Sequence, residues 1–196
     1  MLELVGLGVV LTIALAAIAG PLIVEAVPHA PSEEPYAPPS PANLLGTDDI
    51  GHDVLVKLVE GARTSMIIGV SAAVITTLIG LLVGVVAGYY HGGLVDEALS
   101  ALIDVFLVIP PLPLMIVLAA YLKPSIWNVV LVIGLLWWPG TARVIRARVM
   151  QLRRAEFIEY LRCLGASDAY VLVKHVIPNV VELALARFIL AVPHAI

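Results

Sequence analysis

The 196-residue chain has few charges, one cysteine and no phosphate-binding loop. Asp, Glu, Lys and Arg make up 13% of the residues, against about 25% in an ordinary soluble domain. The single cysteine, Cys163, excludes an internal disulfide framework and a cysteine-based metal site. No G-x-x-x-x-G-K-[ST] sequence is present, so we expect this chain not to bind ATP. The histidines lack the spacing of metal ligands, so no metal site is expected; they are His29, His52, His91, His175 and His194.

Apolar residues dominate the composition. They make up 61% of the chain, and the mean hydropathy is +1.03. A water-soluble fold of this length could not bury so much apolar surface, and about 20 apolar residues suffice for one membrane-spanning helix. We therefore predict an all-α polytopic membrane protein with about five transmembrane helices. The predicted spans are 4–24, 64–89, 99–121, a fourth that starts at 126–138 and continues past Pro139, and 178–196.

The first 63 residues divide into two predicted segments. Residues 1–25 are predicted to form an anchor helix; a secretory signal peptide is the alternative, but the basic start and the small-residue cleavage site are missing. Residues 26–63 are predicted to lie outside the membrane. Six prolines in residues 28–42 exclude a helix interior and predict an extended connector. An amphipathic helix is expected from about Asp53 to Arg63.

Residues 64–196 are predicted to form the main transmembrane domain. Gly80, Gly84 and Gly88 recur every four residues, which predicts a groove for close helix packing and no particular function. Three prolines within residues 110–113 predict a kink in the third span. Asp104 lies in or near that span, where an acid indicates either a functional site or a paired or hydrated group near the membrane surface.

Basic residues concentrate in one loop, 143–178. Seven of the eleven Lys and Arg residues lie between Arg143 and Lys174, which predicts that this loop and the N-terminus are cytoplasmic. At helical spacing, four arginines fall within about a third of the circumference. They could reach lipid headgroups or an acidic partner surface, or serve only to set topology; they are Arg143, Arg146, Arg153 and Arg154.

The same loop has the pattern of two short helices. Apolar residues in 156–164 recur at the spacing of an amphipathic helix. Gly165 follows at a position where helices commonly end. Ser167 or Asp168 can cap a second helix, and Pro178 is expected to end the loop and start the last span. This arrangement predicts a rigid protrusion that could transmit movement between a soluble motor and the membrane helices.

The loop resembles the cytoplasmic coupling ("EAA") loop of ABC import permeases. Glu159 opens the motif, Gly165 follows at the family's spacing, and Ile177–Pro178–Asn179 closes it. Three further stretches occur in the order seen in the dipeptide/oligopeptide/nickel class of these permeases. They are 45–48 with 51–55, 61–65, and 138–143. The resemblance covers residues 44–196.

The resemblance implies a permease subunit of an ATP-driven, binding-protein-dependent importer in the cytoplasmic membrane, moving peptides, nickel or other small solutes. Expected partners are a second permease subunit, two ATP-binding cassette subunits and an external solute-binding protein, with no nucleic acid. ATP would be bound and hydrolysed on the partner subunits, so the chain would have no catalytic residue. The implied ATPase-coupling residues are Arg154, Glu159, Leu164, Gly165, Ala166, Asp168, His175 and Pro178.

The chain departs from the family pattern in several places. Tyr160 and Leu161 replace the motif's two alanines, and His52 replaces a usual arginine. Arg187 lies within the fifth span, where an unpaired charge costs about 2.5–3.5 kcal/mol, and Glu182 is a poor same-face partner. The family normally has six spans, so the sequence is expected to be truncated at its C-terminus.

Two other functions remain as alternatives. A degenerate or truncated membrane scaffold without transport activity would account for a missing sixth span. A secondary transporter would need ionisable residues buried in several spans, and only Asp104, Glu182 and Arg187 qualify.

Overall fold

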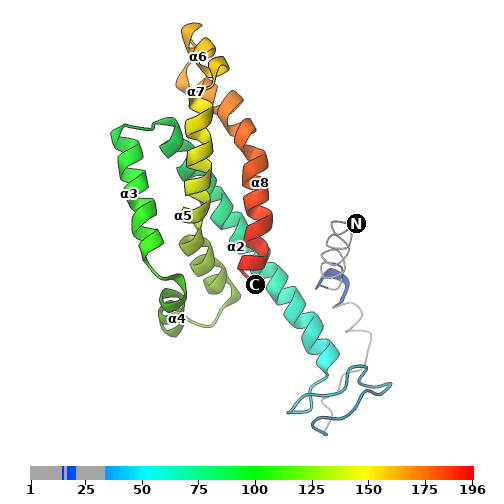
Figure 1. Cartoon of the computed structure of the whole chain (residues 1–196). Coiled ribbons are helices and arrows are strands. Elements are labelled where there is room, and N and C mark those ends of the chain that lie inside the picture. Colours follow the sequence, from blue (N-terminus) through cyan, green and yellow to red (C-terminus); the bar gives the residue numbers. More distant parts are fainter. Residues whose placement is uncertain (1–14, 16, 21–33) are drawn as a thin grey trace. The chain divides into compact units, whose positions relative to one another are not determined.

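The computed structural model describes residues 15, 17–20 and 34–196 (Figure 1). Apart from one isolated bridge between Thr47 and Asp53, the regular structure of these residues is helical, which confirms the predicted all-α class. Most of the predicted anchor helix, 4–24, lies outside the described residues. The helices are α2 (Val54–Tyr89), α3 (Leu94–Val108), α4 (Pro111–Tyr121), α5 (Ile126–Arg153), α6 (Glu156–Cys163), α7 (Asp168–Val171), the π-helical turn η1 (Leu172–Val176) and α8 (Ile177–His194).

The chain forms two compact units, which divide between Ile67 and Ile68 within α2. In the first unit, residues 34–53 fold back on themselves. The amide of Tyr36 donates to the carbonyl of Asp48 at 3.0 Å, and the hydroxyl of Thr47 accepts from the amide of Ala37 at 2.7 Å. Residues 36–42 contain no helix, as the prolines predict, and backbone hydrogen bonds close the segment into a loop.

Asp53 marks the start of α2. Its Oδ1 accepts hydrogen bonds from the amides of Leu55 at 2.7 Å and Val56 at 3.2 Å, which satisfies donors that the first helical turn leaves free. The helix then continues without interruption through Arg63 to Tyr89. The amphipathic helix expected from Asp53 to Arg63 is thus the first part of α2 rather than a separate element.

Asp48 holds the loop before α2 together. Its Oδ1 accepts from the backbone amides of Ile50 at 3.0 Å and His52 at 2.8 Å, and its Oδ2 accepts from the Lys57 ammonium. The hydrogen bond from Lys57 is the main cause that lowers the pKa of Asp48 to about 2. All four residues come from the stretch 48–57, so this short sequence encodes a locally closed turn.

The second unit, residues 68–196, is built on close packing of α2 against α5. A Cβ atom added at Gly84 would lie 2.6 Å from the carbonyl oxygen of Ala142 and 2.8 Å from the Cβ of Ile145. A Cβ at Gly80 or Gly88 would lie 2.7 Å from an α5 side chain. No side chain larger than hydrogen fits at these distances, so the stripe of glycines lets the two helix backbones approach closely.

Three helical segments of the described chain are long and apolar enough to cross a membrane: Val54–Tyr89, Ile126–Arg153 and Asp168–His194. A fourth candidate is the pair α3 and α4, which the prolines break at residues 109–110 with a bend of 79°. The prolines thus do more than kink the third span, because Pro111 starts a new helix whose N-cap is Pro110.

The last span begins earlier than the sequence suggests. Pro178 was expected to separate the loop from the span, yet the helix runs from Asp168 through η1 into α8 without a break. Pro178 is the second residue of α8. Proline has no amide hydrogen to donate to a helical hydrogen bond, and the π-helical turn just before α8 accommodates this missing bond.

Candidate functional site

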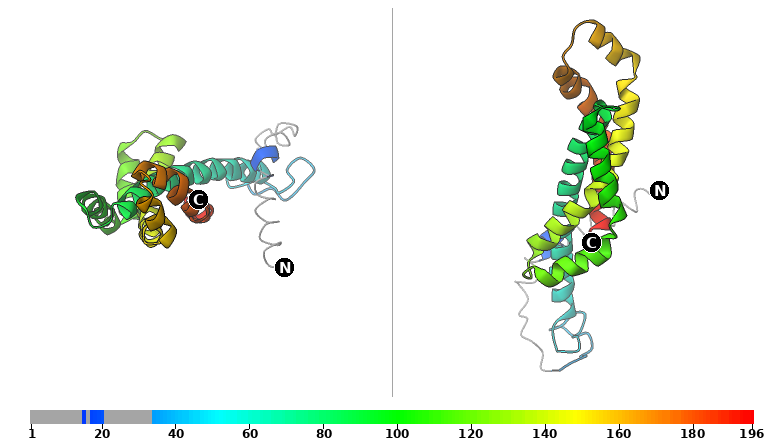
Figure 2. Two further views of the ribbon diagram at one scale, coloured as in Figure 1. Left: turned by 90° about the horizontal axis from the view of Figure 1, so that it is seen from above. Right: turned by 90° about the vertical axis from the view of Figure 1, so that its left-hand side faces the viewer.

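The predicted loop lies at one end of the second unit. Helices α6 and α7 lie beyond the ends of α3 and α5, whereas α4 lies at the opposite end (Figure 1 and the right-hand view of Figure 2). Helix α5 ends at Arg153, and exposed Arg154 follows as its C-cap, with its amide donating to the carbonyl of Gln151 at 3.2 Å. Ala155 then turns the chain into α6.

Gly165 ends α6 in the left-handed backbone conformation, with φ of +83°. Its amide donates to the carbonyl of Arg162 at 2.9 Å, and the amide of Ala166 donates to the carbonyl of Leu161 at 3.1 Å. A Cβ atom added at Gly165 would meet nothing within 4 Å, so the positive φ alone accounts for glycine here. The predicted helix with a glycine end is therefore present.

Ser167, not Asp168, caps α7. The Ser167 hydroxyl accepts from the amide of Tyr170 at 3.4 Å. The carboxylate of Asp168 is used differently, because its Oδ1 accepts from the hydroxyl of Tyr89 at 2.6 Å. The guanidinium carbon of Arg162 lies 5.3 Å from the centre of the Tyr89 ring, a cation–π distance. Hydrogen bonding with Tyr89 is the main cause that raises the pKa of Arg162.

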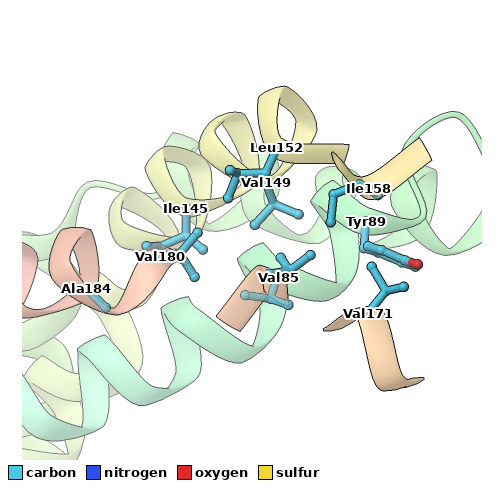
Figure 3. Close-up of a cluster of buried hydrophobic side chains, with 10 residues drawn as sticks. Val85, Tyr89, Ile145, Val149, Leu152, Ile158, Val171, Val180 and Ala184 are labelled. Atoms are coloured by element: carbon cyan, nitrogen blue, oxygen red, sulfur yellow. The ribbon is translucent and has the colours of Figure 1, made fainter. Parts of the chain in front are cut away.

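A hydrophobic cluster fixes the loop to the long helices (Figure 3). Ile158 of α6, Val171 of α7 and Val176 of η1 are each fully buried. They meet the ends of α2, α5 and α8 in a single cluster. Its buried members are Val85, Tyr89, Ile145, Val149, Leu152, Ile158, Val171, Val176, Val180 and Ala184. The helical segments α6, α7 and η1 therefore each contribute a fully buried side chain to the core of the second unit.

The outer surface of the loop is apolar and aromatic. Tyr160 and Leu164, one helical turn apart, are 66% and 67% exposed. Glu159 and Arg154 are also exposed, so charges accompany these apolar groups. Large apolar side chains at this exposure are typical of a surface that binds another protein when they are grouped and bordered by charge.

His175 lies between the two halves of the loop. Its ring centre is 5.5 Å from that of Tyr170 and 6.4 Å from that of Phe157, and its Nε2 is buried without a hydrogen-bond partner. The side-chain amide of Asn179 donates to its backbone carbonyl at 2.7 Å. Pro178 is exposed nearby. The structure thus brings seven of the eight proposed coupling residues to the stretch between α6 and the start of α8, with Arg154 at its entrance.

Sequence reasoning missed a buried ion pair on the same side of the second unit. Asp96, at the start of α3, is 4% exposed and accepts two hydrogen bonds from Arg146 of α5, at 2.7 and 2.9 Å. His91, Gly92 and Ser100 also contact its carboxylate, at 2.7, 3.1 and 3.0 Å. In the sequence, Asp96 is recognisable only as an acid near the start of a helix. No sequence pattern links it to Arg146, which lies fifty positions further along the chain.

The arginine stripe mostly contacts the chain itself. Arg143 pairs with Asp104 at 2.5 Å, Arg146 pairs with Asp96, and Arg153 donates to the carbonyl of His91 at 2.8 Å. Contacts within the chain therefore occupy these three side chains, and the hypothesis that the stripe also reaches headgroups or a partner stays a prediction. For Asp104, the paired alternative is confirmed. Among the described residues, no group of three or more His, Cys, Asp or Glu side chains is placed to hold a metal ion.

Long apolar helices with a structured loop at one end define a multi-pass membrane protein. Residues 80–196 match the family described as "binding-protein-dependent transport system inner membrane component", and the chain belongs to this family.

Several curated relatives are named as peptide permeases. The chain is 36% identical over 159 residues to the oligopeptide transport system permease protein OppC of Bacillus subtilis, covering 81% of this chain and 52% of the relative. It is 32% identical over 196 residues to the dipeptide transport system permease protein DppC of the same organism, covering 100% and 61%. A putative peptide permease protein of Brucella abortus is 36% identical over 158 residues, covering 81% and 52%. The chain thus spans about half the length of these relatives.

Proposed function

We propose that this chain is a permease subunit of an ATP-driven importer that moves peptides across the cytoplasmic membrane. The observation that carries the proposal is the loop from α6 to η1, which is anchored in the core through Ile158 and Val171 and presents Tyr160 and Leu164 to solvent. A loop with a fixed inner side and an exposed apolar outer side can bind a soluble subunit and transmit its movement.

The path of that movement follows from the contacts. A displacement of α6 acts on Ile158, which packs in one cluster with Val149 of α5 and Val180 of α8. Asp168 holds Tyr89 at the end of α2, so this helix is coupled to the loop as well. A push on the loop therefore reaches three candidate spans without crossing a flexible linker.

Each proposed coupling residue has a part in this docking. Glu159 and Arg154 supply charges, Leu164 supplies apolar contact, and Gly165 and Ala166 form the turn between the helices. Asp168, His175 and Pro178 link the turn to the last span. ATP binding and hydrolysis belong to two partner ATP-binding cassette subunits, which dock on this surface.

The remaining assignments rest on sequence. The printed names of the relatives favour peptides over nickel as the cargo. A second permease subunit and an external solute-binding protein complete the importer. The basic loop 143–178 and the N-terminus lie on the cytoplasmic side, since short basic loops stay inside.

Two matched substitutions test the docking surface. Leu164→Asp places a charge on the exposed end of α6, and Leu44→Asp does so at a residue of similar exposure, 57%, in the first unit. In cells that express the whole transporter, we expect Leu164→Asp to lower co-purification of the ATPase subunit and uptake of labelled dialanine about tenfold or more, as at an interface hot spot. Leu44→Asp should leave both unchanged.

The two readouts separate the parts of the proposal. Undiminished co-purification with Leu164→Asp would show that the ATPase docks elsewhere. A wild-type transporter that assembles but takes up labelled nickel and no dialanine would refute the peptide assignment while leaving the docking surface intact.

A further inference from the structure

A cavity of about 290 Å³ with both polar and apolar lining lies among α2, α5 and α8, the three helices that contain the candidate membrane spans. Its lining combines hydroxyl, indole, imidazole and guanidinium groups with apolar residues. The lining residues are Thr76, Trp137, Thr141, Arg187, Leu190, Ala191, Pro193 and His194. A volume of this size is at the lower end of small-ligand sites, so it accommodates one end of a peptide rather than all of it.

Arg187 is the charged residue of this cavity, and the described chain offers it no counter-ion. It lies near the middle of α8, and no Asp or Glu of the described residues forms an ion pair with it. Its Nε is buried without a hydrogen-bond partner. A charged side chain inside a span is costly and by default marks a functional site with a specific partner. A guanidinium in this position therefore calls for an anion.

The other polar groups of the cavity reinforce that requirement. The indole Nε1 of Trp137 is also buried without a partner, and both indole and guanidinium groups are donors only. The Thr76 hydroxyl donates to the carbonyl of Gly134 at 3.4 Å, and Thr141, a residue only 1% exposed, lines the cavity. Two buried donors of the cavity, on Trp137 and Arg187, therefore lack acceptors, and a ligand that satisfies both must supply acceptor atoms.

We propose that Arg187 and Trp137 bind the terminal carboxylate of the transported peptide during its passage. The proposal rests on the peptide importer function proposed above. A guanidinium binds a carboxylate through two parallel hydrogen bonds, and the indole N–H can supply a third. Every unmodified peptide carries this carboxylate whatever its side chains, so one fixed arginine would suit cargo of varied sequence.

A carboxylate from a neighbouring protein helix would satisfy the same donors. A single Asp or Glu carboxyl group would fill only part of the 290 Å³, which favours the larger ligand. The two sources differ in one testable respect. Only the peptide's own carboxylate can be removed by converting dialanine to dialanine amide.

The test is equilibrium binding of labelled dialanine to the complete transporter in lipid nanodiscs without the solute-binding protein, with dialanine and dialanine amide as competitors. For the wild type we expect dialanine to bind about tenfold or more tightly than its amide, as for loss of one charge-assisted contact. Arg187→Gln should remove the preference by weakening dialanine alone, and Arg187→Lys should retain part of it. Lys123→Gln, which removes an exposed charge outside the cavity, should match the wild type.

Each other outcome contradicts the proposal. Equal binding of the two peptides by the wild type, or no binding of either, overturns it. An Arg187→Gln variant that weakens both peptides alike indicates a protein carboxylate instead. If this variant does not assemble, Trp137→Phe keeps an aromatic side chain but lacks the indole N–H, and an unchanged preference would refute the indole contact and with it the proposal. Dialanine uptake by the same transporter shows independently whether the importer function holds.

Discussion

The hydroxyl of Tyr89 donates a 2.6 Å hydrogen bond to Oδ1 of Asp168, although the two residues are 79 positions apart. Tyr89 is the last residue of α2 and Asp168 the first of α7. The guanidinium carbon of Arg162, in α6, lies 5.3 Å from the centre of the same aromatic ring. One side chain at the end of a span therefore contacts both helices of the proposed coupling loop.

Tyr89→Phe tests this contact with the smallest change available. The ring and its packing remain, but Asp168 loses a donor, so we expect the stability of the protein to fall by about 1–2 kcal/mol. We also expect dialanine uptake to fall more than ATPase activity, because the loop remains docked but transmits movement less well. Thermal unfolding in detergent, uptake and ATP hydrolysis measure these effects. Equal losses of uptake and hydrolysis would indicate a purely structural role, and Asp168→Asn, which keeps an acceptor oxygen, should have the weaker effect.

Two of the three acids of α3, Asp96 and Asp104, should differ sharply in their contribution to stability. Asp96 is buried in a network with Arg146, so Asp96→Ala leaves a partly buried guanidinium unpaired and should lower stability by about 3 kcal/mol. Asp104 and Arg143 are exposed, with side-chain exposures of 63% and 61%, so Asp104→Ala should change stability by about 1 kcal/mol or less. Thermal unfolding of the two variants in one detergent measures the difference. Similar effects for both would mean that burial does not separate these ion pairs.

Two glycines of α2 should respond in opposite directions to alanine. At Gly84 the new methyl group would lie 2.6 Å from a backbone carbonyl of α5, so Gly84→Ala should destabilise the protein by about 1–3 kcal/mol. At Gly61 a Cβ atom meets nothing within 4 Å, so Gly61→Ala should stabilise the helix by up to about 1 kcal/mol. Thermal unfolding compares them. A tolerated Gly84→Ala would show that the helix contact relaxes easily.

The loop around Asp48 should lose stability in acid. The pKa of Asp48 is about 2 when the loop is folded and 3.8 ordinarily, so the carboxylate stabilises the fold fully above pH 3.8. This contribution is lost as the pH falls from 3.8 towards 2. Pepsin cleavage within residues 36–53 should therefore increase over this pH interval in the wild type and depend less on pH in Asp48→Asn. Asp49→Asn, at an exposed neighbour, should behave as the wild type.

Hydrophobic runs and local signals predicted much of this fold. The all-α class, the two central spans, the glycine end of α6 at Gly165 and the second loop helix all follow from composition, periodicity and capping preferences. These features depend on residues close together in the sequence, which is why one sequence suffices to predict them.

The rest depends on contacts between distant residues or on the backbone. No local pattern predicts that Asp96 pairs with Arg146, or that Tyr89 bonds to Asp168, because these partners meet only once the helices have packed. The continuous helix through Pro178 was hidden because a proline normally signals a helix start, and a π-helical turn before it leaves no trace in the sequence. The closed loop at residues 36–48 could not be predicted, because its prolines indicate only that the segment is not helical.

The glycine stripe of α2 also restricts how the second unit can change shape. With Ile145 and Val149 seated against Gly84 and Gly88, α2 cannot slide or rotate past α5 without pushing a β-branched side chain into a helix backbone. Over residues 80–88 the two helices therefore resist movement relative to each other. None of the α2 glycines makes such a contact with the broken pair α3–α4, so the stripe constrains the position of that pair least.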